Sequence, residues 1–410
     1  MKTFHNNYLE NIILFLLILG MLVLPTSYME VKLAAIIILI VSNINHNRYK
    51  TPYSKIVMLI LLVIYLKGVW AVGGGVIKGT LEGQELYAKI PFTFLYPLLL
   101  YLLFPYLRAE NAKLHCANTI IIAHALIIGI NLYNLIGLMY GLPILRLTDD
   151  LENVIYDESS LGFGTNNLHQ LIFTTPFVVA MGFSGKIKPV FFVPLLIVTF
   201  GFIVLTSRAA LLVVALISMT IPYIIKKKFN MLSGIKIGRM SIIVATLLLL
   251  LLFRYSHNIY VSSSFDDFAA HFDKNTDIRF NQRELLIKEW KKSPITGVGA
   301  GKKFNDYNRG MVTNFESTYH SDLAQNGLIG FGLFCLYIWL IMSNLYKRAR
   351  EEKNVFYFSC LMGLGCCIVA ASTNPVLGTF DRLFSIYICI ACLSLPAIRF
   401  KEIIKKEARL

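Results

Sequence analysis

Long runs of apolar residues occupy most of this 410-residue chain and limit what it can fold into. The chain is 56% hydrophobic and only 15% charged, and many runs approach the roughly 20 residues that a membrane-spanning helix needs. They do not alternate between apolar and polar residues, as the strands of a transmembrane barrel would. The sequence therefore predicts an all-α polytopic membrane protein. The first run leads to Leu24-Pro25-Thr26 without a small-residue cleavage site, so we expect it to be retained as a span.

Charged and turn-rich breaks divide the apolar runs into twelve predicted transmembrane helices. In the first half of the chain they cover residues 11–24, 31–42, 55–71, 90–106, 116–139 and 169–183. In the second half they cover residues 189–206, 208–225, 240–253, 323–345, 355–372 and 383–398. The resulting organisation is nine helices in 1–253, one large loop with short helices in 254–322, three helices in 323–398 and a basic tail in 399–410.

The connectors between these spans differ sharply in charge. One alternate set holds sixteen lysines and arginines, whereas the short connectors of the other set hold only five, namely Lys78, Lys89, Arg146, Arg208 and Arg382. The positive-inside rule places the first set and both termini in the cytoplasm, and therefore the loop 254–322 on the opposite side. The net charge of +15 is thus an orientation signal, and we predict no nucleic-acid partner.

The large loop contains an amphipathic segment, residues 280–290, with apolar residues at helical spacing and charges on the other face. It ends at Ser293-Pro294, where proline blocks continuation of a helix. We expect a helix on the membrane surface with Trp290 as an interfacial anchor. Arg283 is a candidate ligand for an anion on this helix, and a solvated arginine is the alternative.

A glycine-rich run, Gly297-Val298-Gly299-Ala300-Gly301-Lys302-Lys303, follows this segment. It does not fit a nucleotide-binding P-loop, because Thr296 stands where the first glycine is required and Lys303 stands where Ser or Thr should follow the lysine. A tight turn whose backbone approaches an anionic headgroup is the remaining functional interpretation. Lys302 and Lys303 would add positive charge there.

Two further residues stand at helix ends on the same predicted face. Arg208 separates two apolar runs, which places its guanidinium near the membrane surface, and a planar five-donor group suits a phosphate. A snorkelling or capping arginine is the alternative. His320 precedes a long apolar run, and histidine can accept a proton from a hydroxyl near neutral pH. A histidine that only caps the helix is the alternative.

Other polar residues on this face could line the same cavity. They are Tyr319 and Asp322 beside His320, Asn167 before one span, and the pair Asp381-Arg382 before another. Ordinary helix capping or a local ion pair explains them equally well. No second histidine stands at metal-ligand spacing, so we predict neither a metal site nor a cofactor.

Three motifs in order resemble the O-antigen ligase and polymerase family of bacterial envelopes. They are Ser207-Arg208-Ala209, the Arg283 segment running into Ser293-Pro294-Ile295-Thr296-Gly297-Val298-Gly299, and His320 followed by Asn326-Gly327-Leu328-Ile329-Gly330. The resemblance covers residues 190–345 in motif detail and the whole chain in the layout of spans. Many members have asparagine after the histidine, and this chain has Ser321, which puts any role of that side chain in doubt.

The resemblance implies a glycosyltransferase of the bacterial inner membrane with its active site facing the periplasm. The donor would be an O-antigen glycan on undecaprenyl diphosphate, and the acceptor a sugar hydroxyl of the lipid A core. By position, Arg208 and Arg283 match arginines assigned to the diphosphate, and His320 matches the histidine proposed as the base. Positioned arginines can stabilise a diphosphate leaving group without a metal, and no carboxylate pair suggests a retaining route. We therefore expect an inverting transfer.

Two alternatives stay open. An O-antigen polymerase would use the same donor with a second lipid-linked glycan as acceptor; one late loop ending in a single histidine favours the ligase. A transporter of lipid-linked glycans would need charged residues in mid-membrane and broken helices in matching halves. The predicted spans lack these features apart from Lys67 near an outer end.

Overall fold

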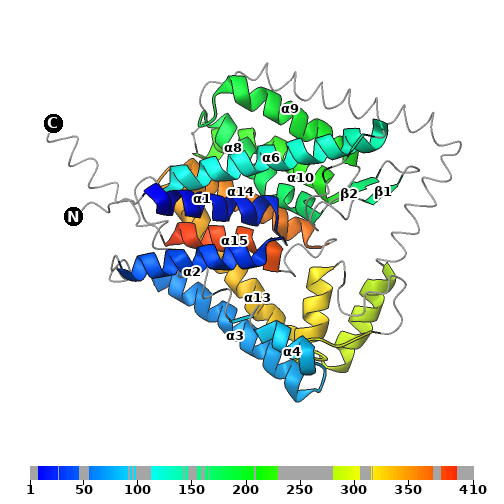
Figure 1. The fold of residues 1–410 in the computed structure, drawn as a ribbon. Coiled ribbons are helices and arrows are strands. Elements are labelled where there is room, and N and C mark those ends of the chain that lie inside the picture. The colour runs from blue at the N-terminus through cyan, green and yellow to red at the C-terminus, as the bar shows by residue number, and fades with distance from the viewer. Residues whose placement is uncertain are drawn as a thin grey trace, which may run out of the picture.

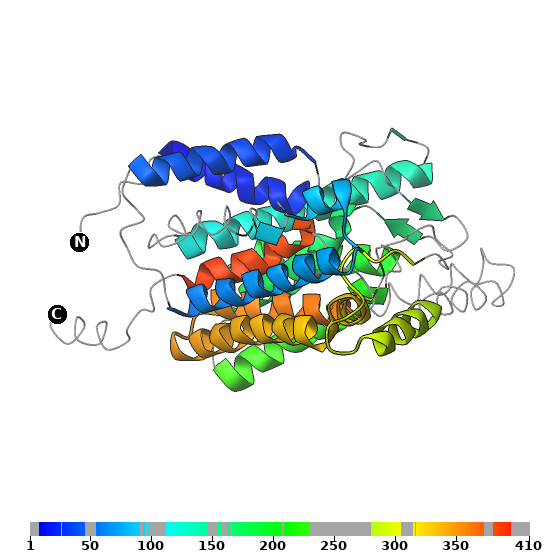
Figure 2. The same cartoon turned by 90° about the horizontal axis from the view of Figure 1, so that it is seen from below.

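The computed structural model describes sixteen stretches of the chain, and the structural statements below concern these residues. They are 8–25, 27–45, 55–90, 93–94, 97, 112–140, 142–143, 145, 155–157, 162–164, 166–206, 209–229, 280–304, 315, 317–372 and 380–394. Nearly all regular structure in them is helical, and the helices run side by side as a bundle (Figures 1 and 2). A hairpin of two three-residue strands, β1 (Ile155–Asp157) and β2 (Gly162–Gly164), is a small addition that the sequence did not predict.

Ten of the twelve predicted spans coincide with helices. The helices of the first half are α1 (Tyr8–Val23), α2 (Met29–Asn45), α3 (Lys55–Ile77), α4 (Gly83–Ile90), α6 (Ala112–Tyr140), the 3-10 turn η4 (Asn166–Gln170), α8 (Leu171–Phe183) and α9 (Pro189–Thr206). Those of the second half are α10 (Ala209–Ile224) with the π-helical turn η5 (Ile225–Phe229), a helix at 280–292, α13 (Thr318–Glu351), α14 (Val355–Ala370) and α15 (Phe380–Leu393). The predicted span 240–253 and most of 90–106 lie outside the described residues.

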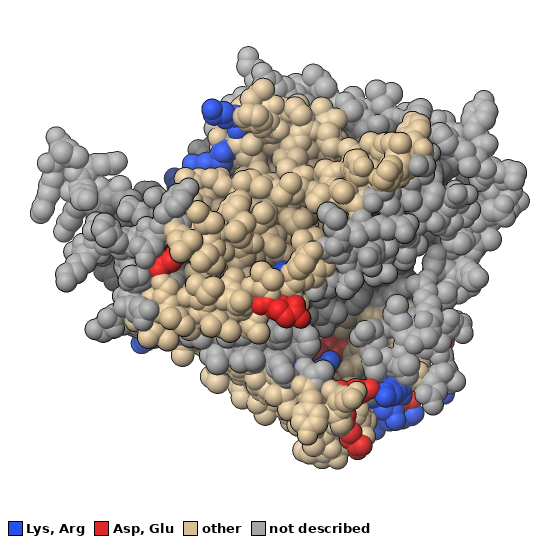
Figure 3. Space-filling view, viewed as in Figure 1, with Lys and Arg blue, Asp and Glu red and all other residues tan. Residues whose placement is uncertain are grey.

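Length and composition mark this as a membrane protein. Among the described helices, four are long and apolar enough to cross a bilayer: Lys55–Ile77, Lys113–Gly137, Ala210–Lys227 and Thr318–Glu351. Shorter apolar helices accompany them. On the face shown in Figure 3, the surface over α1 and α6 carries few charged side chains, whereas charged side chains gather around the position of α4.

The centre of the bundle is the pair α8 and α14, and every residue of α8 is buried. Small residues allow close approach here: a Cβ on Gly363 of α14 would come within 2.7 Å of the Phe173 ring of α8. Such glycine contacts are typical of helix packing in membranes, where backbones must come close together. α14 also contacts α10, α13 and α15, and α13 contacts α3. These contacts fix the ends of α3, α13 and α14, which hold the candidate site.

Candidate active site

α13 consists of two helices that meet at Gly327. The backbone of Gly327 has φ 65° and ψ −170°, which is not helical. The first part, residues 318–326, carries His320 and Asp322, whereas the apolar stretch 328–345 has no Asp, Glu, Lys or Arg and is long enough to span a membrane. The short first helix therefore lies outside the apolar span, and it presents the polar residues of the predicted site.

The glycine-rich turn fills the break at Gly327. In an unbroken helix, the amides of Leu328 and Ile329 would donate to the carbonyls of Ala324 and Gln325. Here these four groups bond to the turn instead: the two amides donate to Pro294 O (2.9 Å) and Ile295 O (3.2 Å), and the two carbonyls accept from Val298 N (2.8 Å) and Gly299 N (3.0 Å). These four backbone groups are thus satisfied, as burial requires.

This arrangement leaves room only for glycine at the two contact points. Gly297 has φ 72°, and a Cβ there would lie 2.3 Å from Gln325 O. A Cβ on Gly327 would lie 2.3 Å from both Gly297 N and Ile295 O. Since L side chains rarely adopt such φ values, the two glycines hold the turn against the kink. The amides of Val298 and Gly299 are consequently engaged within the protein and cannot bind an anion.

The end of α3 holds the other side of the turn. Lys78 Nζ donates to Thr296 Oγ1 at 2.9 Å and to the carbonyl of Gly297. Thr80 Oγ1 donates to Ala300 O at 2.8 Å. Three segments far apart in the sequence are therefore joined at one end of the bundle: the end of α3, the turn and the start of α13 (Figure 1).

The helix 280–292 confirms the predicted helix ending at Ser293. Its apolar face packs on protein: Leu286 is fully buried in a cluster with Phe304, Phe315 and Ala324, and Trp290 packs against that cluster. The indole N–H of Trp290 donates to Pro294 O at 3.0 Å. Within the described part, this face therefore packs on Phe304, Phe315 and the start of α13; a position of this helix on the membrane surface stays a prediction.

His320 is held by the residue that precedes α13. Ser317 Oγ lies 2.7 Å from His320 Nδ1. Ser317 occupies the N-cap position but makes no side-chain cap hydrogen bond, so its hydroxyl serves the imidazole. In the tautomer in which Nδ1–H donates to the serine oxygen, Nε2 is the nitrogen that can accept a proton. Sequence reasoning missed Ser317, although a serine three residues before a candidate base was a readable signal.

Arg283 lies close enough to His320 to influence its charge. Partial burial lowers the pKa of His320 below its usual value of 6.5, and the positive charge of Arg283 lowers it further. The Nε of Arg283 is itself buried and has no hydrogen-bond partner among the described residues. A buried guanidinium nitrogen without an acceptor is costly, which makes Arg283 a candidate to bind an anion. The structure thus brings together two of the three predicted catalytic residues.

An ion pair joins the start of α13 to α3. Lys67 Nζ lies 2.7 Å from Asp322 Oδ1, with side-chain exposures of 22% and 10%. The same carboxylate oxygen accepts from Asn326 Nδ2 at 2.8 Å, and Asn326 O accepts from the indole of Trp70 at 2.8 Å. Lysine in an apolar run needs a partner, and Asp322 is that partner. The pairing across 255 residues of sequence could not be read from spacing alone.

The remaining predicted residues have varied surroundings. The hydroxyl of Tyr319 donates to the carbonyl of Ile368 on α14, and its ring packs against Phe331 and Phe334. Lys302 is exposed, and the exposed Lys303 pairs with Glu85 of α4 at 2.8 Å. A role for these three residues in substrate binding stays a prediction.

Asn167 is engaged within the bundle. It is fully buried, and its amide accepts from Asn131 Nδ2 at 2.9 Å and donates to Val23 O at 3.1 Å. These bonds link η4 to α6 and α1, so Asn167 has a structural role in the bundle.

Asp381 and Arg382 lie in the first turn of α15. Arg208 lies outside the described residues, between the end of α9 and the start of α10.

Comparison with known proteins identifies the middle of the chain. Residues 193–335 match the family model described as O-antigen ligase. This stretch is similar to the O-antigen ligase family. The matched residues include Arg208, Arg283, the glycine-rich turn, His320 and the kink at Gly327, whereas Lys67 and Lys78 of the α3 region lie outside the match. No curated protein matches the chain.

This match describes proteins of one general biochemical class. Members of the O-antigen ligase family are glycosyltransferase-like enzymes of O-antigen processing. Among the described residues, no three His, Cys, Asp or Glu side chains come together as a metal site would require. The candidate site holds a histidine in contact with a serine hydroxyl and near an arginine, and the same helix carries the aspartate of a lysine–aspartate pair.

Proposed function

We propose that this protein is an O-antigen ligase. It transfers O-antigen polysaccharide from undecaprenyl diphosphate to a sugar hydroxyl of the lipid A core, on the periplasmic face of the bacterial inner membrane. The observation that carries the proposal is the placement of His320, held at Nδ1 by Ser317, beside Arg283 within the matched family region. A base next to a cation is the pair that transfer from a diphosphate requires.

In this reaction His320 Nε2 accepts the proton of the acceptor hydroxyl. The hydroxyl oxygen forms a bond to the anomeric carbon of the donor glycan, and the bond from that carbon to the diphosphate oxygen breaks. The electron pair leaves with the diphosphate. A single displacement of this kind inverts the anomeric centre.

Arginines carry the leaving-group charge. Arg283 has a buried Nε without a partner among the described residues, so a diphosphate oxygen can accept its hydrogen bond at no cost to an existing contact. Arg208 would supply a second planar donor group from the α9–α10 connection. Charge-assisted bonds to two arginines stabilise the departing diphosphate without a divalent cation.

The low pKa of His320 suits this role. A histidine whose pKa lies below 6.5 is neutral at physiological pH and can accept a proton without first losing one. Arg283 thus serves both partners of the reaction: it attracts the anionic donor, and it keeps the neighbouring imidazole in its basic form.

The experiment that tests the proposal is the lipopolysaccharide profile of cells lacking this gene, with and without the wild-type gene restored. We expect loss of the whole ladder down to bare core, with polymerised glycan still on its lipid carrier. Core capped by a single repeat unit would instead identify a polymerase, and an unchanged ladder would favour transport of a lipid-linked glycan. Either of these results would overturn the ligase assignment.

A further inference from the structure

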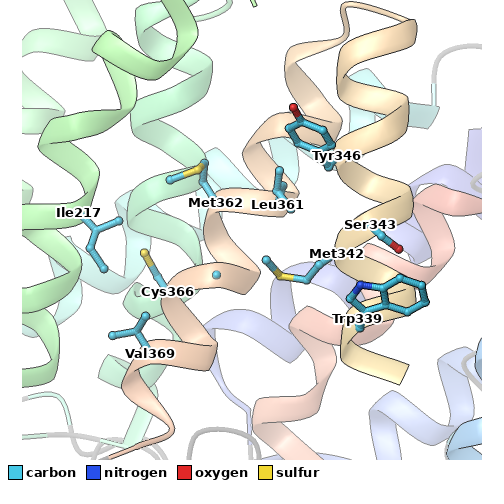
Figure 4. A pocket seen from close by; sticks show the side chains of 10 residues that line it. Ile217, Trp339, Met342, Ser343, Tyr346, Leu361, Met362, Cys366 and Val369 are labelled. Atoms are coloured by element: carbon cyan, nitrogen blue, oxygen red, sulfur yellow. The ribbon is translucent and has the colours of Figure 1, made fainter. Parts of the chain in front are cut away.

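An apolar groove of about 540 Å³ runs between α10, α13 and α14. Its volume lies in the range of roughly 300–1,000 Å³ that ligand sites occupy. The lining residues are almost all hydrophobic: Ile217, Trp339, Met342, Ser343, Tyr346, Leu361, Met362, Gly365, Cys366 and Val369. Figure 4 shows Tyr346 and Leu361 toward one end of the groove and Trp339 and Val369 toward the other. The hydroxyl of Ser343 donates to Leu340 O of its own helix, so it is not directed at a polar ligand.

The groove opens on the outer surface of the bundle. Trp339 is 62% exposed and Val369 is 46% exposed, while Cys366 is buried at 1%. Trp339 and Met342 belong to the apolar stretch of α13 that is long enough to span a membrane. A ligand in this position would enter from the lipid phase and contact apolar side chains along its length. An apolar groove that opens to the lipid phase suits a hydrocarbon chain as its ligand.

One end of the groove meets the candidate active site. The carbonyl of Ile368, next to Val369, accepts the hydrogen bond from the hydroxyl of Tyr319. The carbonyl of Ala371 accepts from Thr318 N at 3.1 Å. The groove end at Val369 is thus one helical turn from the contacts that hold the His320 helix. The third wall is α10, which begins directly after Arg208.

We propose that this groove binds the polyprenyl chain of the lipid-linked donor, with the diphosphate at the end next to His320. This inference rests on the proposed function, because it takes the donor to be a polyprenyl diphosphate. From Leu361 to Val369, α14 rises about 12 Å, so the groove holds the isoprene units nearest the diphosphate. The rest of the chain lies in the bilayer.

Gly365 allows the groove to be filled without damage to the bundle. It lines the groove, and a Cβ at this position would have no neighbouring atom within 4 Å. Gly365→Leu should therefore place its side chain in the empty space. Gly332 provides a matched control, because it is also helical, also has no atom within 4 Å of a Cβ, and does not line the groove.

The first test measures transfer kinetics of the full-length protein in lipid vesicles with two donors. One carries a long polyprenyl chain, and the other carries a single isoprene unit on the same glycan diphosphate. We expect Gly365→Leu to raise KM for the long-chain donor by about tenfold and to leave the kinetics of the short donor unchanged. Gly332→Leu should behave as wild type with both. Equal effects on both donors, or none in Gly365→Leu, would overturn the proposal.

The second test measures binding without transfer, so that it stands even if the proposed reaction is wrong. A photoreactive polyprenyl diphosphate should label peptides of α13 and α14 in the wild type, and unlabelled polyprenyl diphosphate should compete. Labelling should fall in Gly365→Leu and persist in Gly332→Leu. If a photoreactive phospholipid labels the same peptides and polyprenyl diphosphate fails to displace it, the groove holds ordinary membrane lipid and the inference fails. If neither donor is turned over by wild type, the proposed function fails instead.

Discussion

Ser317 Oγ lies 2.7 Å from Nδ1 of His320, one residue before the helix that carries the imidazole begins. The contact ties the ring to a backbone position that is itself buried. When Nδ1–H donates to the serine oxygen, the lone pair of the imidazole is at Nε2, where the acceptor hydroxyl can reach it. In the proposed reaction the serine is a positioning residue, and the histidine is the base.

Removing the serine hydroxyl should slow transfer through the histidine. We expect Ser317→Ala to lower kcat by about tenfold, less than the 10²–10⁴ that proton transfer typically contributes, because the ring remains but loses its fixed tautomer and orientation. Ser317→Thr, which keeps the hydroxyl, should retain most of the activity. The measurement is kcat against pH for the three proteins. A purely structural serine would change the yield of folded protein and leave the pH profile unaltered.

The charge of Arg283 should be visible in the pH dependence of the reaction. Because burial and Arg283 lower the pKa of His320, the base stays neutral below pH 6.5, and activity should fall only as pH drops through the lowered value. In Arg283→Gln the pKa should rise toward 6.5, so the acid limb of the residual activity should move to higher pH. Lys288→Gln, on the exposed side of the same helix, is the control. An acid limb that moves equally in both variants would contradict a specific effect of Arg283.

The kink at Gly327 should be essential to the site and tolerant of no side chain. Gly327→Ala places a Cβ 2.3 Å from Gly297 N at φ 65°, a strain of about 1–3 kcal/mol for the backbone alone. We expect the turn to detach from α13 and glycan transfer to be lost. Increased protease sensitivity of the 293–304 segment would report the detachment. Gly332→Ala on the same helix meets no atom within 4 Å and should leave both unchanged. Wild-type activity in Gly327→Ala would show that the turn does not order the site.

Removing one charge of the Lys67–Asp322 pair should destabilise the protein more than removing both charges. Both side chains are largely buried, and an unpaired buried charge destabilises by about 3–5 kcal/mol. We therefore expect Lys67→Met alone to lower the thermal stability of the purified protein more than Lys67→Met combined with Asp322→Asn. Stability losses that simply add in the double variant would mean that the two charges act independently.

Much of the fold could be predicted from the sequence, because membrane spans leave a strong local signal. The apolar runs at 55–71, 116–139 and 355–372 correspond to α3, α6 and α14. A lipid environment forces such runs to satisfy their backbone internally, so composition alone decides the helix. Helix 280–292 could also be predicted, because its helical periodicity and the stop at Ser293-Pro294 are local features of the sequence.

The contacts that build the site could not be predicted in this way. The engagement of Gly297 with Gly327 and of Lys67 with Asp322 joins residues far apart in the chain. Sequence spacing predicts which residues are neighbours on one helix, whereas these pairs depend on how separate helices pack together. The glycine-rich turn shows the difference: its residue types suggested an anion-binding backbone, and its amides in fact replace the hydrogen bonds lost at the α13 kink.

The most direct test of the central claim is transfer by His320→Ala in a purified system. Wild-type and variant proteins in lipid vesicles would receive a glycan linked to polyprenyl diphosphate as donor and a lipid A core as acceptor. Donor binding would be measured alongside turnover. We expect the variant to bind donor as wild type does and to transfer at least about 10²-fold more slowly, as expected for loss of a general base. Transfer by His320→Ala at the wild-type rate near neutral pH would contradict the account.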